Sequence, residues 1–116
     1  MIKEQRRCIA AIAAALINHI RPNAVYDYDN HKYTQFMIDI NGKNISFYDY
    51  ERRSYITGIL PNLYDYGTKK YVQLLFSGTY FNGFDFSTGT YFNGSVNGRE
   101  VSFFDYEDSR YHNYGV

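Results

Sequence analysis

The hydrophobic residues follow one period in the first twenty residues and another in the rest of the chain. Ile9, Ile12 and Leu16 are spaced by three and four, as on one face of an α-helix. Ala, the strongest helix former, is concentrated in the same segment. Pro22 ends the segment, because the residue before a proline disfavours the helical backbone. We therefore expect an amphipathic helix within residues 1–21, packed on its own domain.

From residue 22 onward, apolar and polar residues alternate, which is the pattern of half-buried β-strands. Ile45, Phe47 and Asp49 fall on one side of an extended chain, and the intervening residues fall on the other. The side with aliphatic residues and Phe is predicted to face the core. The same rule places Phe76 on the core side of residues 71–77.

One motif occurs five times: an aromatic residue, Asp, an aromatic residue, four mostly polar residues, and a further aromatic residue. Repeats of this kind indicate a duplicated supersecondary unit. The Tyr-Asp pairs are similar to the YD repeats of large bacterial shell and toxin proteins. No copy has the Gly-Arg that usually follows there, so we assign no family. The copies are Tyr26-Asp27-Tyr28 with Tyr33, Tyr48-Asp49-Tyr50 with Tyr55, Tyr64-Asp65-Tyr66 with Tyr71, Phe84-Asp85-Phe86 with Tyr91, and Phe104-Asp105-Tyr106 with Tyr111.

Turn signals lie both within the copies and between them. Asn-Gly at 41–42 and at 97–98 is the strongest short hairpin signal, because both positions of such a turn need positive φ. Two turns per copy imply an antiparallel up-and-down meander of about ten short strands. The predicted fold is therefore mainly β with an N-terminal α-helix (α+β), in a single domain spanning 1–116. Residues 22–116 form the meander, which curls into a barrel-like or two-layer sheet.

The ends of this meander affect its expected contacts. The helix is expected to plug or cover one opening of the curled sheet. Strands at residues 24–28 and 110–115 are expected to be exposed edges, and exposed edges can pair with a second copy. A homodimer through edge strands is therefore one expected assembly.

The repeated Asp is expected to have a structural role. It comes at the end of a strand, where its carboxylate can accept backbone N–H groups from the following turn. A calcium site is the alternative, since Asp27/Asp29 and Asp105/Glu107/Asp108 come near the required spacing. A position that recurs with the fold is more typical of a fold requirement. We expect no metal and no cofactor.

Composition excludes several classes of protein. The 116 residues carry 12 Lys and Arg against 12 Asp and Glu, which excludes a polybasic nucleic-acid arm and an acidic mimic. A single Cys excludes an internal disulfide framework and a cysteine zinc site. Aromatic residues make up 20% of the chain, too many for a disordered tail. No apolar run reaches the ~18 residues of a membrane span, so no transmembrane segment is expected.

The first residues allow two interpretations of location. Basic residues followed by an apolar run and Ala13-x-Ala15 resemble a secretory signal within residues 1–15, which would make the protein secreted. Glu4 in the basic part and Ile17 beyond the cleavage site argue against a signal. We expect a cytoplasmic protein.

The chemistry of catalysis is not recognisable in the sequence. His19, His31 and His112 have no Ser or Cys partner in a known nucleophile setting, and Cys8 has no His at a diagnostic spacing. Phosphate-loop, dinucleotide and zinc-protease motifs are missing. We expect a protein that is not an enzyme.

Two interpretations of the side that carries the motif aromatics remain open. It is either a structural ladder of rings, partly covered by the helix, or a Tyr-rich contact surface. The contact surface predicts a non-catalytic protein-binding module, such as a small inhibitor or adaptor, with nucleic acid disfavoured by the neutral charge. Alternatives are a carbohydrate or cell-envelope binding module and a single-strand nucleic-acid binder. The predicted binding residues are Arg52, Arg53, Lys69, Lys70, Tyr50, Tyr55, Tyr66 and Tyr71.

Overall fold

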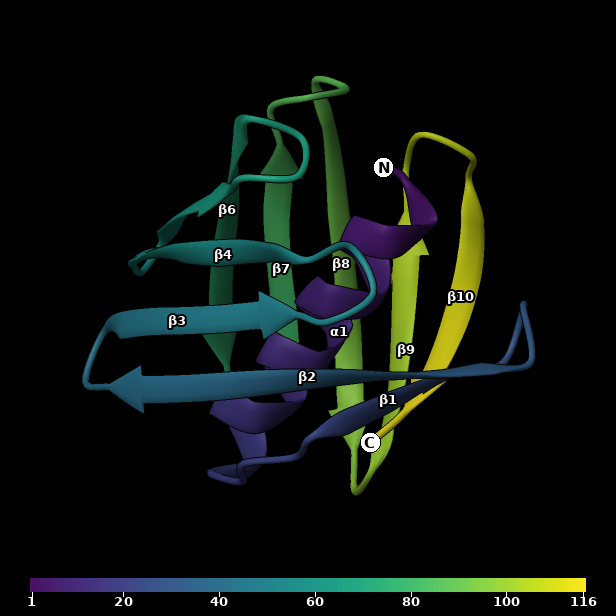
Figure 1. The fold of residues 1–116 in the computed structure, drawn as a ribbon. Coiled ribbons are helices and arrows are strands. Elements are labelled where there is room, and N and C mark those ends of the chain that lie inside the picture. Colours follow the sequence, from purple (N-terminus) through teal and green to yellow (C-terminus); the bar gives the residue numbers. More distant parts are fainter.

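The structure is a computed structural model that describes residues 1–116, and it forms a closed antiparallel barrel around one helix (Figure 1). Each strand pairs with its neighbours in the chain, and the last strand pairs with the first. The predicted fold class is confirmed: mainly β, an N-terminal helix, and a ten-strand meander curled into a barrel. The elements are α1 (Lys3–Asn18), β1 (Ala24–Asp27), β2 (Lys32–Asn41), β3 (Asn44–Asp49), β4 (Ser54–Ile59), β5 (Asn62–Asp65), β6 (Lys70–Ser77), β7 (Tyr80–Asp85), β8 (Thr90–Asn97), β9 (Glu100–Asp105) and β10 (Arg110–Gly115).

The closure of the barrel corrects the expectation of exposed edge strands. Tyr26 of β1 pairs with Gly115 of β10, and Asp27 pairs with Tyr114. The backbone N–H of Tyr28 continues this seam by donating to the carbonyl of Asn113 at 3.1 Å. A closed barrel has no row of unpaired backbone groups, so the predicted homodimer through edge strands has no edge to use.

Helix α1 runs through the interior of the barrel instead of covering an opening. Figure 1 shows it between β2–β4 on one side and β7–β9 on the other. Ile9 and Ile12 are fully buried, and so is Ala14 on the opposite face of the helix. Of the two predicted arrangements, covering one opening is therefore wrong, and plugging the barrel is closer to the observed position. The Ala residues explain the difference, because a helix that is small and apolar all round fits between close walls, whereas an amphipathic one would not.

Two glycines let the wall of β7 and β8 curve tightly against the core. A Cβ at Gly83 would lie 1.8 Å from the carbonyl oxygen of Gln73, so no other residue fits there. The ring of Phe92 occupies the space over Gly83, and the ring of Phe81 occupies the space over Gly94 in the cross-strand pair. Aromatic rings that cover cross-strand glycines pin the register of such strands. Phe81 and Phe92 thus fill the gap between wall and helix.

The two ends of the barrel have different turns. At one end, Gly42 and Lys43 join β2 to β3, with Gly42 at φ +60°. This is the pattern of a type II′ turn, in which Gly takes the first central position. The predicted Asn-Gly turn is therefore wrong by one residue, because Asn41 still pairs with Asn44 as part of the strands.

At the other end, each motif contributes a loop of four residues that starts directly after its Asp. The fourth loop residue has positive φ in every copy, although only Gly89 is a glycine. The remaining four are His31, Arg53, Lys69 and Ser109, with φ between 50° and 60°. We call this the motif-loop end of the barrel.

The predicted core side is correct, but at the end of β6 a residue on that side is exposed. Val72 and Leu74 are buried against the core, whereas Phe76 is 41% exposed. Phe76 pairs with the buried Phe81 of β7 and lies one residue before the end of β6, so only its exposure differs from the prediction.

Candidate functional site

The five motif Asp residues form a buried ring at the motif-loop end. The Oδ1 atom of each accepts the backbone N–H of the residue two positions later, at 2.8–3.0 Å. This is the Asx-turn geometry, and it confirms the predicted hydrogen bond from the turn to the Asp. Each of these Asp residues is at most 5% exposed, so its carboxylate needs hydrogen-bond partners to offset the cost of burial. The ring consists of Asp27, Asp49, Asp65, Asp85 and Asp105.

Three arginines neutralise part of this ring from inside the barrel. Arg6 of α1 donates to Asp105 at 3.0 Å and to the hydroxyl of Tyr114 at 2.9 Å. Arg7 of α1 donates to Asp49 at 2.9 Å. Arg6 and Arg7, near the start of the helix, are therefore buried ion-pair partners, whereas Lys3 is exposed.

Arg52 supplies the third arginine, which corrects its role as an exposed anchor for a partner. Its Nε donates to Asp49 at 2.9 Å, and its Nη1 lies 3.1 Å from Asp65. The side chain is only 12% exposed. Burial alone would lower the pKa of Arg52, but the surrounding acidic groups outweigh it and raise the pKa. Arg52 therefore stabilises two adjacent loops, and little of it reaches a partner.

The other predicted binding residues lie on the surface, and the barrel brings the second and third loops together. Arg52 crosses from one loop to the other through Asp65, and the N–H of Tyr66 donates to the carbonyl of Tyr55 at 2.9 Å. The exposed members of the predicted set are Arg53, Lys69, Lys70, Tyr50, Tyr55, Tyr66 and Tyr71.

The aromatic residues of the motif form five exposed clusters on the outside of the barrel, not under the helix. In each copy, the first ring contacts the other two, with centroids 4.5–5.1 Å apart. Most of these contacts are edge-to-face, the arrangement that aromatic pairs prefer. The first ring is half-buried and the other two are exposed. The rings thus form the predicted ladder and leave an aromatic surface open to solvent.

A shallow hollow of about 730 Å³ lies on the outside of β4, β5 and β6. Tyr66 and Tyr71, both predicted binding residues, line it together with Tyr64 and Ile59. Ile59 is 63% exposed, although it is a large aliphatic residue. The sequence did not single out Ile59 as a candidate, because alternation assigns a strand residue beside a turn to one side of the sheet but does not show how exposed it is. We call this hollow the β4–β6 groove.

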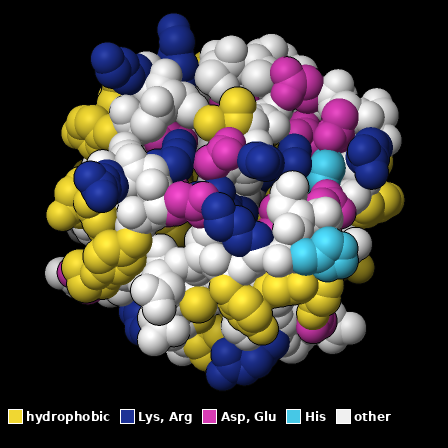
Figure 2. Space-filling model, turned by 45° about the vertical axis from the view of Figure 1, so that its right-hand side comes forward, with side chains coloured by type: hydrophobic (Ala, Val, Ile, Leu, Met, Phe, Trp, Pro, Cys, Tyr) yellow, Lys and Arg dark blue, Asp and Glu magenta, His cyan; other side chains and the backbone are white.

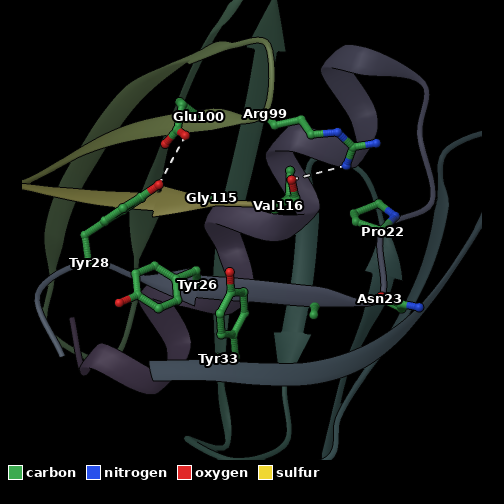
Figure 3. A pocket seen from close by; sticks show the side chains of 10 residues that line it. Pro22, Asn23, Tyr26, Tyr28, Tyr33, Arg99, Glu100, Gly115 and Val116 are labelled. Atoms are coloured by element: carbon green, nitrogen blue, oxygen red, sulfur yellow. Dashed lines mark hydrogen bonds between the residues drawn. The ribbon is translucent and has the colours of Figure 1, made fainter. Parts of the chain in front are cut away.

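A second hollow, of about 350 Å³, marks the seam where the first and last strands meet (Figure 3). The Tyr28 hydroxyl donates to Glu100 at 3.2 Å, and Arg99 donates to the carbonyl of Val116 at 3.2 Å. The hydrogen bond to Glu100 raises the pKa of Tyr28. These contacts join the first motif copy to β9 and β10, so they contribute to closing the barrel.

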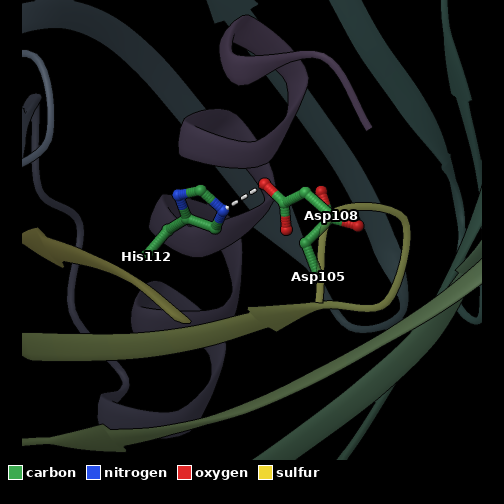
Figure 4. A group of neighbouring side chains, drawn as sticks. All are labelled: Asp105, Asp108 and His112. Carbon is green, nitrogen blue, oxygen red and sulfur yellow. Dashed lines mark hydrogen bonds and ion pairs between the residues drawn. The ribbon is translucent and has the colours of Figure 1, made fainter. Parts of the chain in front are cut away.

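A third cluster has the residue types of a metal site. Ligand atoms of Asp105, Asp108 and His112 lie within 4.8 Å of one another (Figure 4). Arg6 is already 3.0 Å from Asp105 and 3.9 Å from Asp108, and both ring nitrogens of His112 face carboxylates. A metal ion would have to displace the Arg6 guanidinium, so the geometry gives no reason to assign one here.

Cys8, the one candidate nucleophile of the sequence, is a buried interior group. Its thiol is 3.4 Å from Asp49, and burial together with this carboxylate raises the pKa of the thiol. A thiol that stays protonated at neutral pH is a poor nucleophile. The arrangement around Cys8 therefore favours a structural role.

Charges of both signs mix on the surface. Figure 2 shows Lys and Arg interleaved with Asp and Glu across the middle of one face, with hydrophobic side chains toward its left and lower margins. Elsewhere on the barrel, the exposed Lys32 is paired with Glu51. A surface that binds phosphate backbones needs an excess of cations, whereas the chain carries 12 Lys and Arg against 12 Asp and Glu.

None of the helices is both long and apolar enough to cross a membrane. Comparison with known proteins finds no family model, no curated protein and no solved structure that matches this chain.

Proposed function

We propose that this protein is a non-catalytic binding module that holds another protein in the β4–β6 groove. The observation that carries the proposal is the exposure of Ile59, Tyr66 and Tyr71 in one hollow. The core has its own set of buried aliphatic and aromatic side chains, so the fold does not need these three for its interior. An exposed group of large apolar side chains on a soluble barrel wall is typical of an interaction site.

The residues around the groove suit a protein partner. Tyr is enriched among the residues that contribute most to interfaces, where truncation costs ~2 kcal/mol or more. Arg53, Lys69 and Lys70 are exposed at the adjoining loops, and they favour a partner with acidic groups around an apolar centre. Contacts with the ring of Tyr64 hold Tyr66 and Tyr71 in place before binding, which lowers the entropy cost of association.

Affinity capture from native lysate tests the proposal. The wild-type protein, a Tyr66→Ser/Tyr71→Ser variant and a Tyr33→Ser variant serve as baits, with equal melting temperatures as the check on folding. Tyr33 is exposed on β2 and lines the seam hollow instead of the groove. We expect one protein to be retained by the wild type and by Tyr33→Ser but not by the double variant. Equal retention by all three baits would contradict the proposal.

Charge reversal gives a second readout of the same site. Arg53→Glu with Lys69→Glu is expected to slow association and to flatten its salt dependence, because exposed rim charges act mainly on the association rate. Arg52 is left unchanged in this variant, since it holds the loops together. An unchanged association rate would place the partner elsewhere on the barrel.

A further inference from the structure

Two further hollows lie side by side on the outside of β7, β8 and β9, away from the β4–β6 groove. Their volumes are about 520 and 410 Å³. Both are lined by Asn82 and Asn93, which face each other as a cross-strand pair. The two hollows are therefore two halves of one surface, with the amide pair between them.

Exposed tyrosines border this surface: Tyr91 and Tyr80 lie on either side of the amide pair along the strands, and Tyr111 is in register with Asn93 through Phe104. Tyr91 and Tyr106 line the first hollow, and Tyr80 and Tyr111 line the second. Tyr80, Tyr91 and Tyr111 are each more than 60% exposed, so a large part of each ring is open to contact. Tyr91 precedes Asn93 by two residues and Tyr80 precedes Asn82 by two on the antiparallel neighbour, so the rings lie about 14 Å apart along the strands.

The lining of this surface is uncharged, as in the β4–β6 groove, but it has a facing pair of amides and no exposed aliphatic side chain such as Ile59. Neither hollow is lined by any Lys, Arg, Asp or Glu. The polar groups that remain are amides and hydroxyls, which both donate and accept hydrogen bonds. A partner with phosphate, sulfate or carboxylate groups would find no opposite charge, so the surface is complementary to an uncharged ligand with many hydroxyls.

We infer that the β7–β9 surface binds a short, neutral oligosaccharide. Pyranose rings have an apolar face that can lie on the exposed tyrosines and an edge of hydroxyls that can bond to Asn82 and Asn93. The separation of Tyr91 and Tyr80 along the strands gives room for several linked sugars rather than one. This site goes beyond the proposed protein-binding groove, because it uses other strands and other residues.

The surface is held in place before any ligand arrives. Asn93 donates one amide hydrogen to the Tyr106 hydroxyl at 3.0 Å, which orients the amide and leaves its oxygen and second hydrogen free. On the inner side of the same two strands, the rings of Phe92 and Phe81 pack over the cross-strand glycines Gly83 and Gly94. A rigid site suits a sugar ligand, since little entropy is lost in ordering the protein.

Isothermal titration calorimetry on the full chain tests the inference. The probes are chitopentaose, cellopentaose and laminaripentaose, their monosaccharides, and pentagalacturonate as a charged counterpart. We expect at least one neutral pentasaccharide to bind in the millimolar range or tighter, at least tenfold tighter than its monosaccharide, and the galacturonate not to bind. Asn93→Ala and Tyr91→Ser are each expected to weaken that binding by about tenfold, the size expected for one lost directional contact.

Matched variants keep the test specific. Gln35→Ala and Tyr33→Ser remove an amide and a ring from the exposed side of β2, outside both hollows, and are expected to bind like the wild type. Thermal melting of all four variants checks that the barrel is intact. The inference is overturned if no neutral pentasaccharide binds, if the galacturonate binds more tightly, or if Asn93→Ala and Tyr91→Ser bind as well as the controls. These variants leave Tyr66 and Tyr71 unchanged, so the result does not depend on whether the β4–β6 groove binds a protein.

Discussion

Arg7 of the central helix and Asp49 of the barrel wall lie 2.9 Å apart in the buried end of the molecule. Asp49 also accepts the Nε of Arg52 at 2.9 Å and the backbone N–H of Glu51 at 3.0 Å. One carboxylate thus joins the helix, the β3 strand and the loop that follows it. The repeated Asp is more than a turn residue in this copy, because it ties the interior to the wall.

The copies are predicted to differ in how strongly their Asp stabilises the fold. Asp49→Asn leaves Arg7 and Arg52 without their shared charge, and breaking a buried ion pair costs ~3–5 kcal/mol. Asp85 has no arginine partner; it accepts from Ser87 and Thr88 and lies 4.0 Å from the N-terminal ammonium of Met1, so ~1–3 kcal/mol is expected for Asp85→Asn. Urea unfolding measures both values. Equal losses at the two positions would show that the arginines contribute little.

The position of the helix makes a second prediction. Ala14 faces away from Ile9, Ile12 and Leu16, so a helix lying on the outside of the sheet would expose it. Inside the barrel it is fully buried, and Ala14→Leu is expected to overpack the core at a cost of ~1–3 kcal/mol. Differential scanning calorimetry gives the change in Tm. Lys3→Leu, at an exposed position of the same helix, is the control and should melt near the wild type.

The sequence predicted the repeat, the alternation and the meander, because each depends on spacings of a few residues. Closure of the barrel depends on β1 meeting β10, some ninety residues away, and no local pattern encodes that contact. The apolar spacing of Ile9, Ile12 and Leu16 predicted the helix, but one apolar face does not show that the helix is surrounded by the barrel on all sides. The small size of the intervening Ala residues is what allows a helix inside the barrel.

The candidate site was predictable in its aromatic part and less so in its charged part. Alternation correctly placed Tyr66 and Tyr71 on the side opposite the core. Arg52 and Arg53 are neighbours of the same type, and only the structure shows that the first points to Asp49 and Asp65 while the second is exposed. Side-chain direction within a four-residue loop follows from the backbone conformation, which composition does not reveal.

The difference between these two arginines can be measured directly. Arg52→Glu would place a third acidic group against Asp49 and Asp65 in a half-buried position, so it is expected to destabilise the fold by ~3 kcal/mol or more. Arg53→Glu changes an exposed charge and should alter stability by less than ~1 kcal/mol. Guanidinium unfolding of the two variants compares them. Similar stability of both would contradict the buried ion-pair network.

Stability is predicted to fall at both ends of the pH range. Burial raises the pKa of Asp49 and Asp108, but hydrogen bonds from Arg52 and His112, respectively, outweigh it and hold both pKa values below 3.8. The stabilisation from these two ionised carboxylates is therefore complete above pH ~4 and is lost as the pH falls through their lowered pKa values. Burial raises the pKa of Cys8 and of Tyr114 above their unfolded-state pKa values of 9.0 and 10.0. The stabilisation from these two neutral groups is therefore lost as the pH rises above those values.

Thermal melting from pH 2 to pH 11 checks this profile, with a plateau expected between about pH 5 and pH 8. Asp108→Asn should reduce the slope on the acid side and leave the alkaline side unchanged. A Tm that is constant down to pH 2 would mean that these carboxylates are not stabilised by their partners.

The central claim is that a partner protein occupies the β4–β6 groove, and site-specific photo-crosslinking tests it most directly. A photoreactive phenylalanine analogue replaces Tyr71 in one sample and Tyr33 in another, and both are irradiated in native lysate. The account predicts one dominant protein adduct at position 71, its loss when Tyr66→Ser is added, and no such adduct at position 33. An adduct that forms equally at both positions, or only at position 33, would contradict the account.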